Sequence, residues 1–496
     1  MDHPFVKINH PYGMLVKMKN IILLLLLMAL NQAANATIRT GNDKNIPELN
    51  PFFEGLASVS IDNKYGYINK NADFIIKPQF DFAGDFKNGM AIIRQGDKYG
   101  IIDKTGKYLI PASLDVLKKC KNYFLYKKDG KWGLMSKELQ LVMAPIYDFA
   151  FTSNDYEPTI VLVTGKFAEK KPDMTNRLNA GEKIIADKYV FVDSLGKEIS
   201  KLKASIGGFQ SRYDRFFDTV FIYSDSKVGI ADKHGKIIFP PKYKKLLPYW
   251  KNYVLFEKDG KLGVMDFNGK VTIPAEFGGK YECFYHENLV LLQKQGDSFS
   301  LYRCDGKLLN EFSLSPDFIQ NSYLRTPLIL SDIKLGNIQI NEKGEIINRF
   351  DKKYDVFFTG ENLLIFSSVN SPKVGIMDAD GNILIKQKYE TLNLFDNGLI
   401  IAFDAKGKAG VLNLKGEIIV PFNFSCIVES TPRMIFSEGL TFASKENITG
   451  GKVDYICGYI NQKGNYVLIY DFKTKTFKKV NDNSTLTHEQ EHSKQK

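Results

Sequence analysis

The stretch YVLFEKDGKLGVMDFNGKVTIP, Tyr253 to Pro274, decides the fold, because it predicts three short strands joined by two tight turns. Asp259-Gly260 predicts the first turn, since this pair tolerates the positive φ angles of a hairpin. Asp266 and Gly269 predict the second turn, where the carboxylate can accept backbone N–H bonds and the glycine can adopt a left-handed conformation. Pro274 ends the third strand because it has no N–H group for a ladder. The predicted strands cover residues 253–257, 262–266 and 271–273.

Gly263 lies in the middle strand, where a glycine costs stability unless something needs the missing side chain. Tyr65, Tyr99 and Trp132 directly precede the equivalent glycine elsewhere in the chain. We therefore expect an aromatic ring to lie across the bare backbone, in a close-packing site rather than a ligand contact.

The same pattern recurs along the chain at spacings of 33 to 57 residues: a glycine, an Asp or Asn three residues later, and a second glycine three after that. Such a period is typical of an array built from one supersecondary unit. The mid-strand glycines that we expect to be structural are Gly66, Gly100, Gly133, Gly229, Gly263, Gly375, Gly410 and Gly458, with Trp132 and the turn residues Asp103, Asp232, Asp266 and Asp378. More degenerate copies start at Val190, Ser300 and Ile338, which makes eleven in all.

These units predict an all-β fold, a tandem repeat array of about eleven three-stranded β-meanders over residues 52–470. A single meander cannot bury both of its faces, so neighbouring units must stack. Propellers use four to eight blades, so eleven units favour an open, curved, solenoid-like array, with one or two propeller-like rings as the alternative. Insertions near 156–188 and 431–455 disturb the period.

The two ends of the chain differ from the array. Residues 1–36 predict a signal peptide, since Lys19 precedes ten apolar residues, Ile21 to Leu30, and Ala34-Asn35-Ala36 suits cleavage before Thr37. Met18 is an alternative start. Residues 37–51 read as a linker and 471–496 as a polar C-terminal tail. We expect an exported protein, periplasmic or extracellular, that is soluble and has no transmembrane helix after cleavage.

Charge and cysteine content exclude some classes of partner. The formal net charge is +11, or +9 after loss of residues 1–36, but only nine of the 67 cationic residues are Arg, and Lys lies mostly in turns. We therefore expect no nucleic-acid binding. The five cysteines form no CxxC pair and predict neither a disulfide framework nor a zinc site. Cys283 and Cys304 could pair in an oxidising compartment, or be buried as small hydrophobic residues.

No catalytic constellation emerges from the sequence. Of six histidines only His234 and His286 lie in the array, and the first occupies a turn position. G-x-S-x-G, H-E-x-x-H, Walker and Rossmann motifs are missing, and the stretch from Asp378 lacks the Gly and Glu of an EF-hand. We expect no catalytic residue, metal or cofactor. An enzyme with a site in 156–188 or around His286 is the less favoured hypothesis.

The stretches KYGYIN (64–69), KYGIIDKTG (98–106) and KWGLM (131–135) resemble the bacterial WG-repeat family, as does the linker PQFDFAGDFKNGMAII (78–93). The characteristic Trp is kept only at Trp132. The resemblance implies an all-β repeat protein, commonly exported and without an assigned catalytic activity, and it implies no binding residues.

Two functions remain open at this stage. The array and the leader favour a non-enzymatic protein-interaction scaffold of the cell envelope, bound to an unidentified envelope protein. The alternative is a carbohydrate- or peptidoglycan-binding protein, because Tyr and Phe are abundant and rings stack on sugars. Exposed rings would favour the second function.

Overall fold

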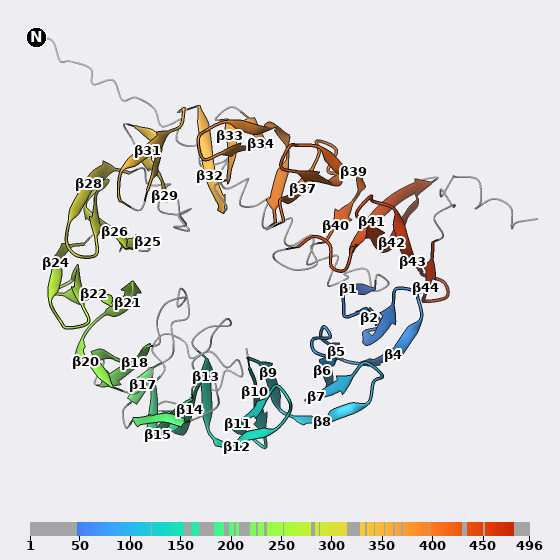
Figure 1. Cartoon of the computed structure of the whole chain (residues 1–496), viewed down its shortest axis with the longest axis horizontal. Coiled ribbons are helices and arrows are strands. Elements are labelled where there is room, and N and C mark those ends of the chain that lie inside the picture. The colour runs from blue at the N-terminus through green and yellow to red at the C-terminus, as the bar shows by residue number, and fades with distance from the viewer. Residues whose placement is uncertain are drawn as a thin grey trace, which may run out of the picture. The chain divides into compact units, whose positions relative to one another are not determined.

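The computed structural model is built from strands, and no helix occurs among the described residues (Figure 1). The structure describes residues 47–120, 122–152, 160–167, 183–192, 198–202, 205–207, 219–224, 227–232, 236–250, 252–278, 283–286, 288–314, 328–332, 335–341, 343–351, 353–360, 363–368, 371–395, 397–428, 434–449 and 452–480. The predicted leader, residues 37–46 and most of the predicted tail lie outside these ranges.

The strands of the first half of the chain form four antiparallel sheets. In chain order they are β1 Glu48–Phe53, β2 Leu56–Ile61, β3 Lys64–Asn69 and β4 Phe74–Phe80; β5 Phe82–Ala83, β6 Met90–Gln95, β7 Lys98–Asp103 and β8 Tyr108–Leu114; β9 Val116–Lys119, β10 Tyr123–Lys128, β11 Lys131–Ser136 and β12 Leu141–Tyr147; and β13 Phe149–Thr152, β14 Ile160–Phe167, β15 Lys183–Val192, β16 Glu198–Leu202, β17 Ser205–Gly207, β18 Thr219–Ser224, β19 Lys227–Asp232 and β20 Ile237–Tyr243.

Six further sheets follow. They are β21 Leu246–Trp250, β22 Tyr253–Lys258, β23 Lys261–Asp266 and β24 Val271–Phe277; β25 Cys283–His286, β26 Leu289–Gln295, β27 Ser298–Arg303 and β28 Leu308–Ser313; β29 Leu328–Asp332, β30 Gly336–Ile340 and β31 Ile346–Arg349; β32 Tyr354–Gly360, β33 Leu363–Ser368, β34 Ser371–Asp378 and β35 Ile383–Tyr389; β36 Thr391–Leu394, β37 Leu399–Phe403, β38 Ala409–Asn413 and β39 Ile418–Phe424; and β40 Cys426–Ile427, β41 Leu440–Thr449, β42 Lys452–Asn461, β43 Tyr466–Asp471 and β44 Thr476–Lys479.

The sheet β21–β24 shows how the repeat is built. The hairpin between β22 and β23 has positive φ at both Asp259 and Gly260, 52° and 75°, as the Asp-Gly pair predicts. After β23, the N–H of Gly269 donates to the carbonyl of Asp266 at 2.9 Å, and Gly269 has φ of 83°. The predicted three strands are present, and a fourth, β21, is added on the other side of β22.

The fourth strand is what the sequence analysis missed in most repeats. It comes from the connector between units, and β9 and β36 are equivalent examples that pair with β10 and β37. These short connectors carry an apolar residue on the buried side, Leu117 and Leu392, which gives the added strand a place in the core. The meander of three strands therefore becomes a four-stranded sheet.

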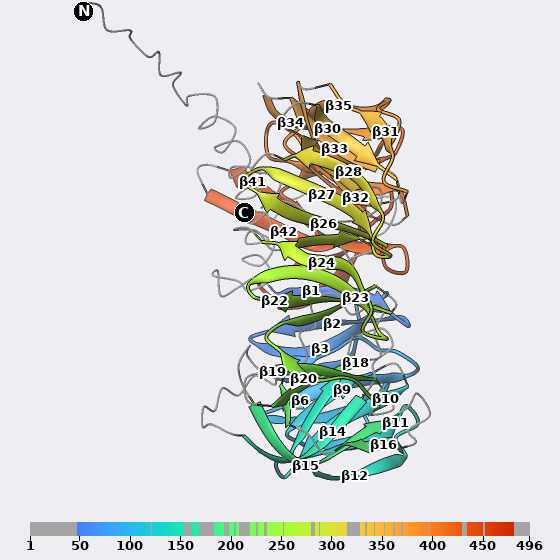
Figure 2. The same ribbon diagram turned by 90° about the vertical axis from the view of Figure 1, so that its left-hand side faces the viewer.

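Contacts divide the chain into two compact units, one of Met1–Gln95, Ile101–Leu109 and Phe350–Lys496, the other of Gly96–Gly100 and Ile110–Arg349. Within each unit the hydrophobic clusters join one sheet to the next rather than filling a single sheet. One cluster holds Val264 and Ile273 from β21–β24 together with Val290 and Leu292 from β25–β28, which Figure 2 shows as successive layers. The stacking of neighbours that the sequence predicts is therefore how the array buries its apolar faces.

The first and the last sheets of the chain are neighbours within the first unit. The ring of Tyr459 on β42 lies 4.8 Å from that of Phe52 on β1, at 62° between the planes. The first and second sheets meet in the same way, with the rings of Tyr67 and Phe86 at 4.7 Å and 57°. Each tyrosine hydroxyl donates to a backbone carbonyl of the neighbouring sheet, at 2.5 Å for Tyr459 and 2.7 Å for Tyr67.

Polar contacts between the last and first sheets also match those between the first and second sheets. The Glu438 carboxylate accepts the N–H of Gly55 at 3.0 Å and pairs with Lys70 at 2.9 Å, which joins the last sheet to the first. One repeat further on, Glu54 pairs with Lys104 at 3.1 Å. The two chain ends therefore meet through an ordinary contact between repeats.

The all-β repeat array is confirmed, and the structure changes some of its predicted bounds. The array begins at β1, four residues before the predicted start, and β44 adds a strand from the region predicted as tail because Phe477 packs against Phe74. The insertion near 156–188 supplies β14 and β15, with 168–182 outside the described residues. The insertion near 431–455 lengthens β41 and β42 into a hairpin that pairs from Leu440↔Asn461 to Thr449↔Lys452.

Candidate functional site

The mid-strand glycines make room for the neighbouring strand. At all eight predicted positions a Cβ would lie within 3 Å of the carbonyl oxygen ten residues later, for example 2.7 Å from that of Ile273 at Gly263. In β24, Phe277 pairs with Leu262 and Ile273 with Val264, so three residues of β24 bulge toward one residue of β23. The bare backbone of glycine accommodates this bulge.

The expected aromatic ring is therefore not the general reason for the glycine. A ring atom lies within 3 Å of the Cβ position at three of the eight glycines, where the ring belongs to Tyr126, Phe366 or Phe422. Trp132, the remaining Trp of the motif, is buried in the hydrophobic cluster that joins its sheet to β14 and β15, and its ring centroid lies 5.8 Å from the ammonium of Lys127.

The four predicted turn aspartates act through their carboxylates on the backbone. Asp103, Asp232, Asp266 and Asp378 each accept the N–H of the residue four positions later, at 2.8 to 3.0 Å. Hydrogen bonds from Thr105, and then from backbone N–H groups, lower the pKa of Asp103 despite the opposing effect of desolvation. These carboxylates stabilise the turns of four different repeats.

Sequence reasoning missed an ion pair that recurs seventeen residues apart. Lys64 pairs with Asp81 at 2.6 Å, and the pairs Lys98–Asp115, Lys131–Asp148 and Lys373–Glu390 are equivalent. The lysine opens the third strand and the acid follows the bulged fourth strand, so the pair spans the bulge. The signal in the sequence is Lys two residues before the glycine and an acid fifteen after it. Because these pairs are partly exposed to solvent, which screens the charges, each contributes little to the free energy of unfolding.

An exposed band of aliphatic side chains marks the start of the last strand in most sheets, eight or nine residues after the mid-strand glycine or its equivalent. Their exposed fractions run from 36% to 66%. We call these residues the aliphatic band: Ile75, Leu109, Leu141, Ile237, Val271, Leu308, Ile347, Ile383, Leu384, Ile418 and Ile419. Single exposed apolar residues are ordinary, but the same exposed position filled repeatedly is the pattern of an interaction surface.

Aromatic side chains are mostly inside. Of sixteen large hydrophobic side chains that are exposed in the described part of the chain, three are aromatic: Phe82, Tyr108 and Tyr455. The largest fully buried side chains include Tyr67, Tyr459 and several phenylalanines. Rings that could stack on sugars are therefore scarce on the surface that the structure describes.

Cysteine and histidine provide no described reactive cluster. Cys120, Cys304, Cys426 and Cys457 are buried, and burial raises the pKa of the Cys457 thiol to about 12. The side chain of Cys283 lies outside the described atoms, so its pairing with Cys304 stays a prediction. His234 is outside the described residues, as is the side chain of His286. Among the described residues no group of three His, Cys, Asp or Glu could hold a metal, and no helix could cross a membrane.

The chain was compared with protein families, curated proteins and solved structures. The model of the WG containing repeat matches residues 65–99, 99–132, 229–261 and 375–403. No protein of curated function matches the chain significantly. A solved structure titled as the eukaryotic initiation factor is 12% identical, with a TM-score of 0.34, and the match covers 79% of this chain and 97% of the other.

Two further solved structures match at low identity. BamB from Moraxella catarrhalis is 13% identical over 65% of this chain and 88% of its own, with a TM-score of 0.23. Kluyveromyces lactis Hsv2p is 8% identical over 76% of this chain and 97% of its own, with a TM-score of 0.21. The WG containing repeat is therefore detected at four places, and each of them contains a mid-strand glycine that the bulged strand requires, as the sequence predicts.

Proposed function

We propose that this chain is an exported, non-enzymatic scaffold that binds protein partners at the cell envelope through the aliphatic band. The observation that supports the proposal is the repeated exposure of an aliphatic residue at one or both of two adjacent positions of the repeat, at the start of β4, β8, β12, β20, β24, β28, β31, β35 and β39. Burial of such side chains by a partner stabilises a complex by about 25 cal/mol per Å² of apolar surface before the costs of association.

The kind of exposed residue favours protein over carbohydrate. Sugar-binding surfaces rely on exposed rings, whereas the exposed apolar residues described here are mainly Ile, Leu and Val. The turn carboxylates are engaged by backbone N–H groups, which supports a role without catalysis. The apolar run Ile21 to Leu30 and the small residues before Thr37 support export.

Affinity capture from an envelope extract tests the proposal. The bait is the purified protein, compared with the double variant Ile383→Asn/Ile418→Asn and with the control Lys386→Asn, which changes an exposed residue of β35 outside the band. We expect one or more proteins that the control retains and the double variant loses, with both variants matching the parent by circular dichroism. Equal capture by all three proteins, or capture of glycan without protein, would refute the scaffold.

Export has its own measurement. Cell fractionation and N-terminal sequencing of the protein should find it outside the cytoplasm with Thr37 as its first residue. Recovery from the cytoplasm with residues 18–36 intact would contradict the proposed localisation.

A further inference from the structure

Three consecutive sheets of the second unit carry a lysine directly before the exposed aliphatic residue. The pairs are Lys236–Ile237 at the start of β20, Lys270–Val271 at the start of β24 and Lys307–Leu308 at the start of β28. All three lysines are exposed, and the aliphatic residues are exposed to nearly the same extent, 48%, 49% and 47%. We call these six residues the cationic ladder. The cationic ladder is part of the aliphatic band, and each of its three Lys–aliphatic pairs, which we call rungs, carries one positive charge.

The rungs are held in place by the turns beneath them. The N–H groups of Lys236 and Lys270 donate to turn aspartates at 2.8 and 2.9 Å, which fixes the backbone where each lysine leaves the turn. The Thr272 hydroxyl, beside Val271, donates to the carbonyl of Cys304 in the next sheet at 2.7 Å. The second and third rungs are therefore tied together.

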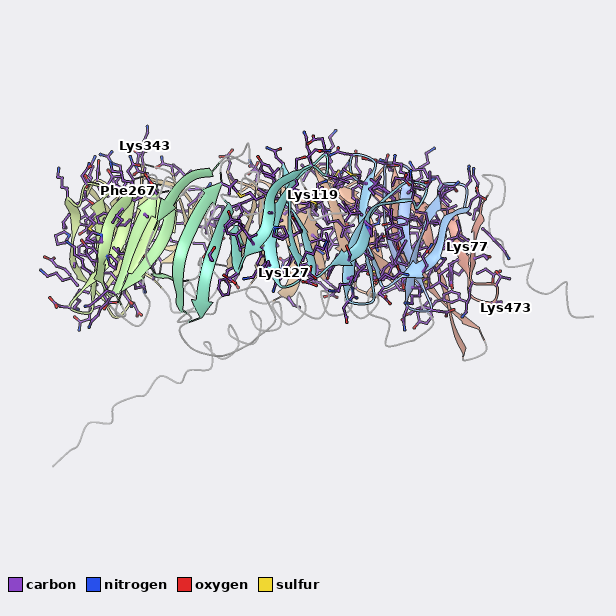
Figure 3. All side chains as sticks on the ribbon, turned by 90° about the horizontal axis from the view of Figure 1, so that it is seen from below. Lys77, Lys119, Lys127, Phe267, Lys343 and Lys473 are labelled. Carbon is purple, nitrogen blue, oxygen red and sulfur yellow. The ribbon has the colours of Figure 1, made fainter. Side chains whose placement is uncertain are left out.

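Aromatic packing ties the first rung to the second. The ring of Phe239, in the same strand as Ile237, lies 6.2 Å from that of Phe267, in the turn that precedes Lys270. Figure 3 labels Phe267 beside this part of the array, together with Lys343, whose side chain is directed away from the ribbon. A surface whose spacing is fixed before binding loses little entropy when a partner docks.

The ladder lysines are available for a partner. None of the three forms a salt bridge with a residue of the described part of the chain. Asp305 lies near Lys307 but is held by the Arg303 guanidinium, which is the main cause of the low pKa of Asp305. Among the described residues, the three positive charges have no carboxylate within ion-pair distance.

The ladder has defined ends within the second unit. The residue that follows the turn is Gln140 in β9–β12 and Glu345, two residues before Ile347, in β29–β31, so within the second unit the lysines occur in the three sheets between them. In the first unit the equivalent residues before Ile383 and Ile418 are Asn382 and Glu417. Lys107 in the first unit also follows its turn aspartate, but Tyr108 comes after it and the ladder pattern of lysine directly before an exposed aliphatic residue is broken there. Three such pairs in consecutive sheets distinguish this segment.

The spacing of the rungs selects the conformation of a partner. Packed sheets lie roughly 10 Å apart. A polyproline II segment has three residues per turn and rises about 9.3 Å per turn, so every third side chain points to the same side at nearly the spacing of the sheets. A β-strand alternates its side chains with a period of two and does not present every third residue to one surface.

Resting on the proposed scaffold function, we infer that the cationic ladder binds an extended, acidic segment of a partner protein in polyproline II conformation. An aliphatic residue at every third position contacts Ile237, Val271 and Leu308. Carboxylates between these residues pair with Lys236, Lys270 and Lys307. Three turns of the segment span the three rungs, which sets the length of the recognised motif at about nine residues.

The test uses the fluorescent peptide (Leu-Glu-Pro)4 and a permuted peptide of the same composition whose leucines are contiguous. Fluorescence anisotropy with the purified protein should show binding of the first peptide and at least about tenfold weaker binding of the second. The variant Lys236→Glu/Lys270→Glu/Lys307→Glu should weaken binding at least about tenfold, and 0.5 M salt should weaken it as well. The first-unit variant Ile383→Asn/Ile418→Asn should leave peptide affinity unchanged.

Different failures point to different conclusions. Equal affinity for both peptides, or equal loss in the ladder and first-unit variants, overturns the ladder as a polyproline II site. Binding of the protein to anionic phospholipid vesicles that the Lys→Glu variant abolishes, without peptide binding, assigns the lysines to a membrane and also overturns the inference. If the ladder variant captures the same envelope proteins as the parent while Ile383→Asn/Ile418→Asn loses them, the scaffold function stands and the ladder does not.

Discussion

Substitution of the mid-strand glycine by alanine should destabilise a repeat although only one methyl group is added. At Gly66 the new Cβ would lie 2.6 Å from the nitrogen of Pro78 and 2.8 Å from the carbonyl carbon of Lys77, both in the bulge of β4. Backbone atoms cannot rotate away as a side chain can. Overpacking of this kind costs about 1–3 kcal/mol, and the smaller entropy of the unfolded alanine chain offsets about 0.5–1 kcal/mol. We expect a net loss of about 1–2 kcal/mol.

Gly84→Ala is the matched control in the same unit. Its Cβ would lie 3.4 Å from the nearest atom, the carbonyl oxygen of Ile92, which is an ordinary contact, and Gly84 has no positive φ. Hydrogen exchange is the suitable assay because a repeat array does not unfold in one step. The amides of β3 and β4 should lose protection by roughly 5- to 30-fold in Gly66→Ala, since about 1.4 kcal/mol corresponds to tenfold. Equal protection in the two variants would refute the bulge as the reason for the glycine.

Three further outcomes follow from the buried tyrosines and cysteine. Tyr459→Phe and Tyr67→Phe should each lower the local free energy of unfolding by about 1–2 kcal/mol, because each substitution leaves a backbone carbonyl without its hydroxyl donor. Hydrogen exchange measures both losses. A much smaller loss of protection in Tyr459→Phe would show that the first and last sheets are joined more weakly than other neighbouring repeats. Burial raises the pKa of both tyrosines, so the free energy of unfolding should fall as the pH rises above about 10, the pKa of tyrosine in the unfolded chain. The fall is at most about 1.4 kcal/mol per pH unit for each tyrosine. Urea midpoints measured at pH 8, 10 and 11 should therefore decrease less steeply with pH in either Phe variant than in the parent. Cys457, with its pKa raised to about 12, should resist a thiol reagent at pH 8 in the folded protein and react on unfolding, so rapid labelling of the native chain at this position would contradict its burial.

The sequence was sufficient for features that depend on a few adjacent residues. Asp259-Gly260 and the turn from Asp266 to Gly269 have the predicted conformations, because turn chemistry is local. The period predicted the stacking of sheets, since a meander has no other way to bury its apolar faces. The resemblance to the WG repeat rested on the same short motifs, and the repeat is detected at four of their positions.

Features that depend on how strands pair could not be predicted from adjacent residues in the sequence. Gly263 is required because the backbone of β24, ten to twelve residues later in the chain, lies close to its Cα. No residue type in the sequence predicts the bulge that brings this backbone close. The fourth strand, as in β36, is a connector of four residues, too short for a clear alternation. The ion pair of Lys64 with Asp81 needs the register of the bulge to be known first.

The repeat separates the residues that build the stack from those that can specify a partner. Glycine, the turn Asp or Asn and the inward-facing side chains are constrained, because each contacts the backbone or the neighbouring sheet. The residue that follows the turn donates its backbone N–H to the turn side chain whatever its type, as Lys270 does at 2.9 Å. Its side chain can therefore differ between sheets, and those of Glu345 and Asn382 also hydrogen-bond to the turn residue. That position is Lys270 in one sheet, Glu345 in another and Asn382 in a third. One scaffold can therefore present segments of different charge beside the same aliphatic residue, and a partner that reads several neighbouring repeats is selected by the order of those charges.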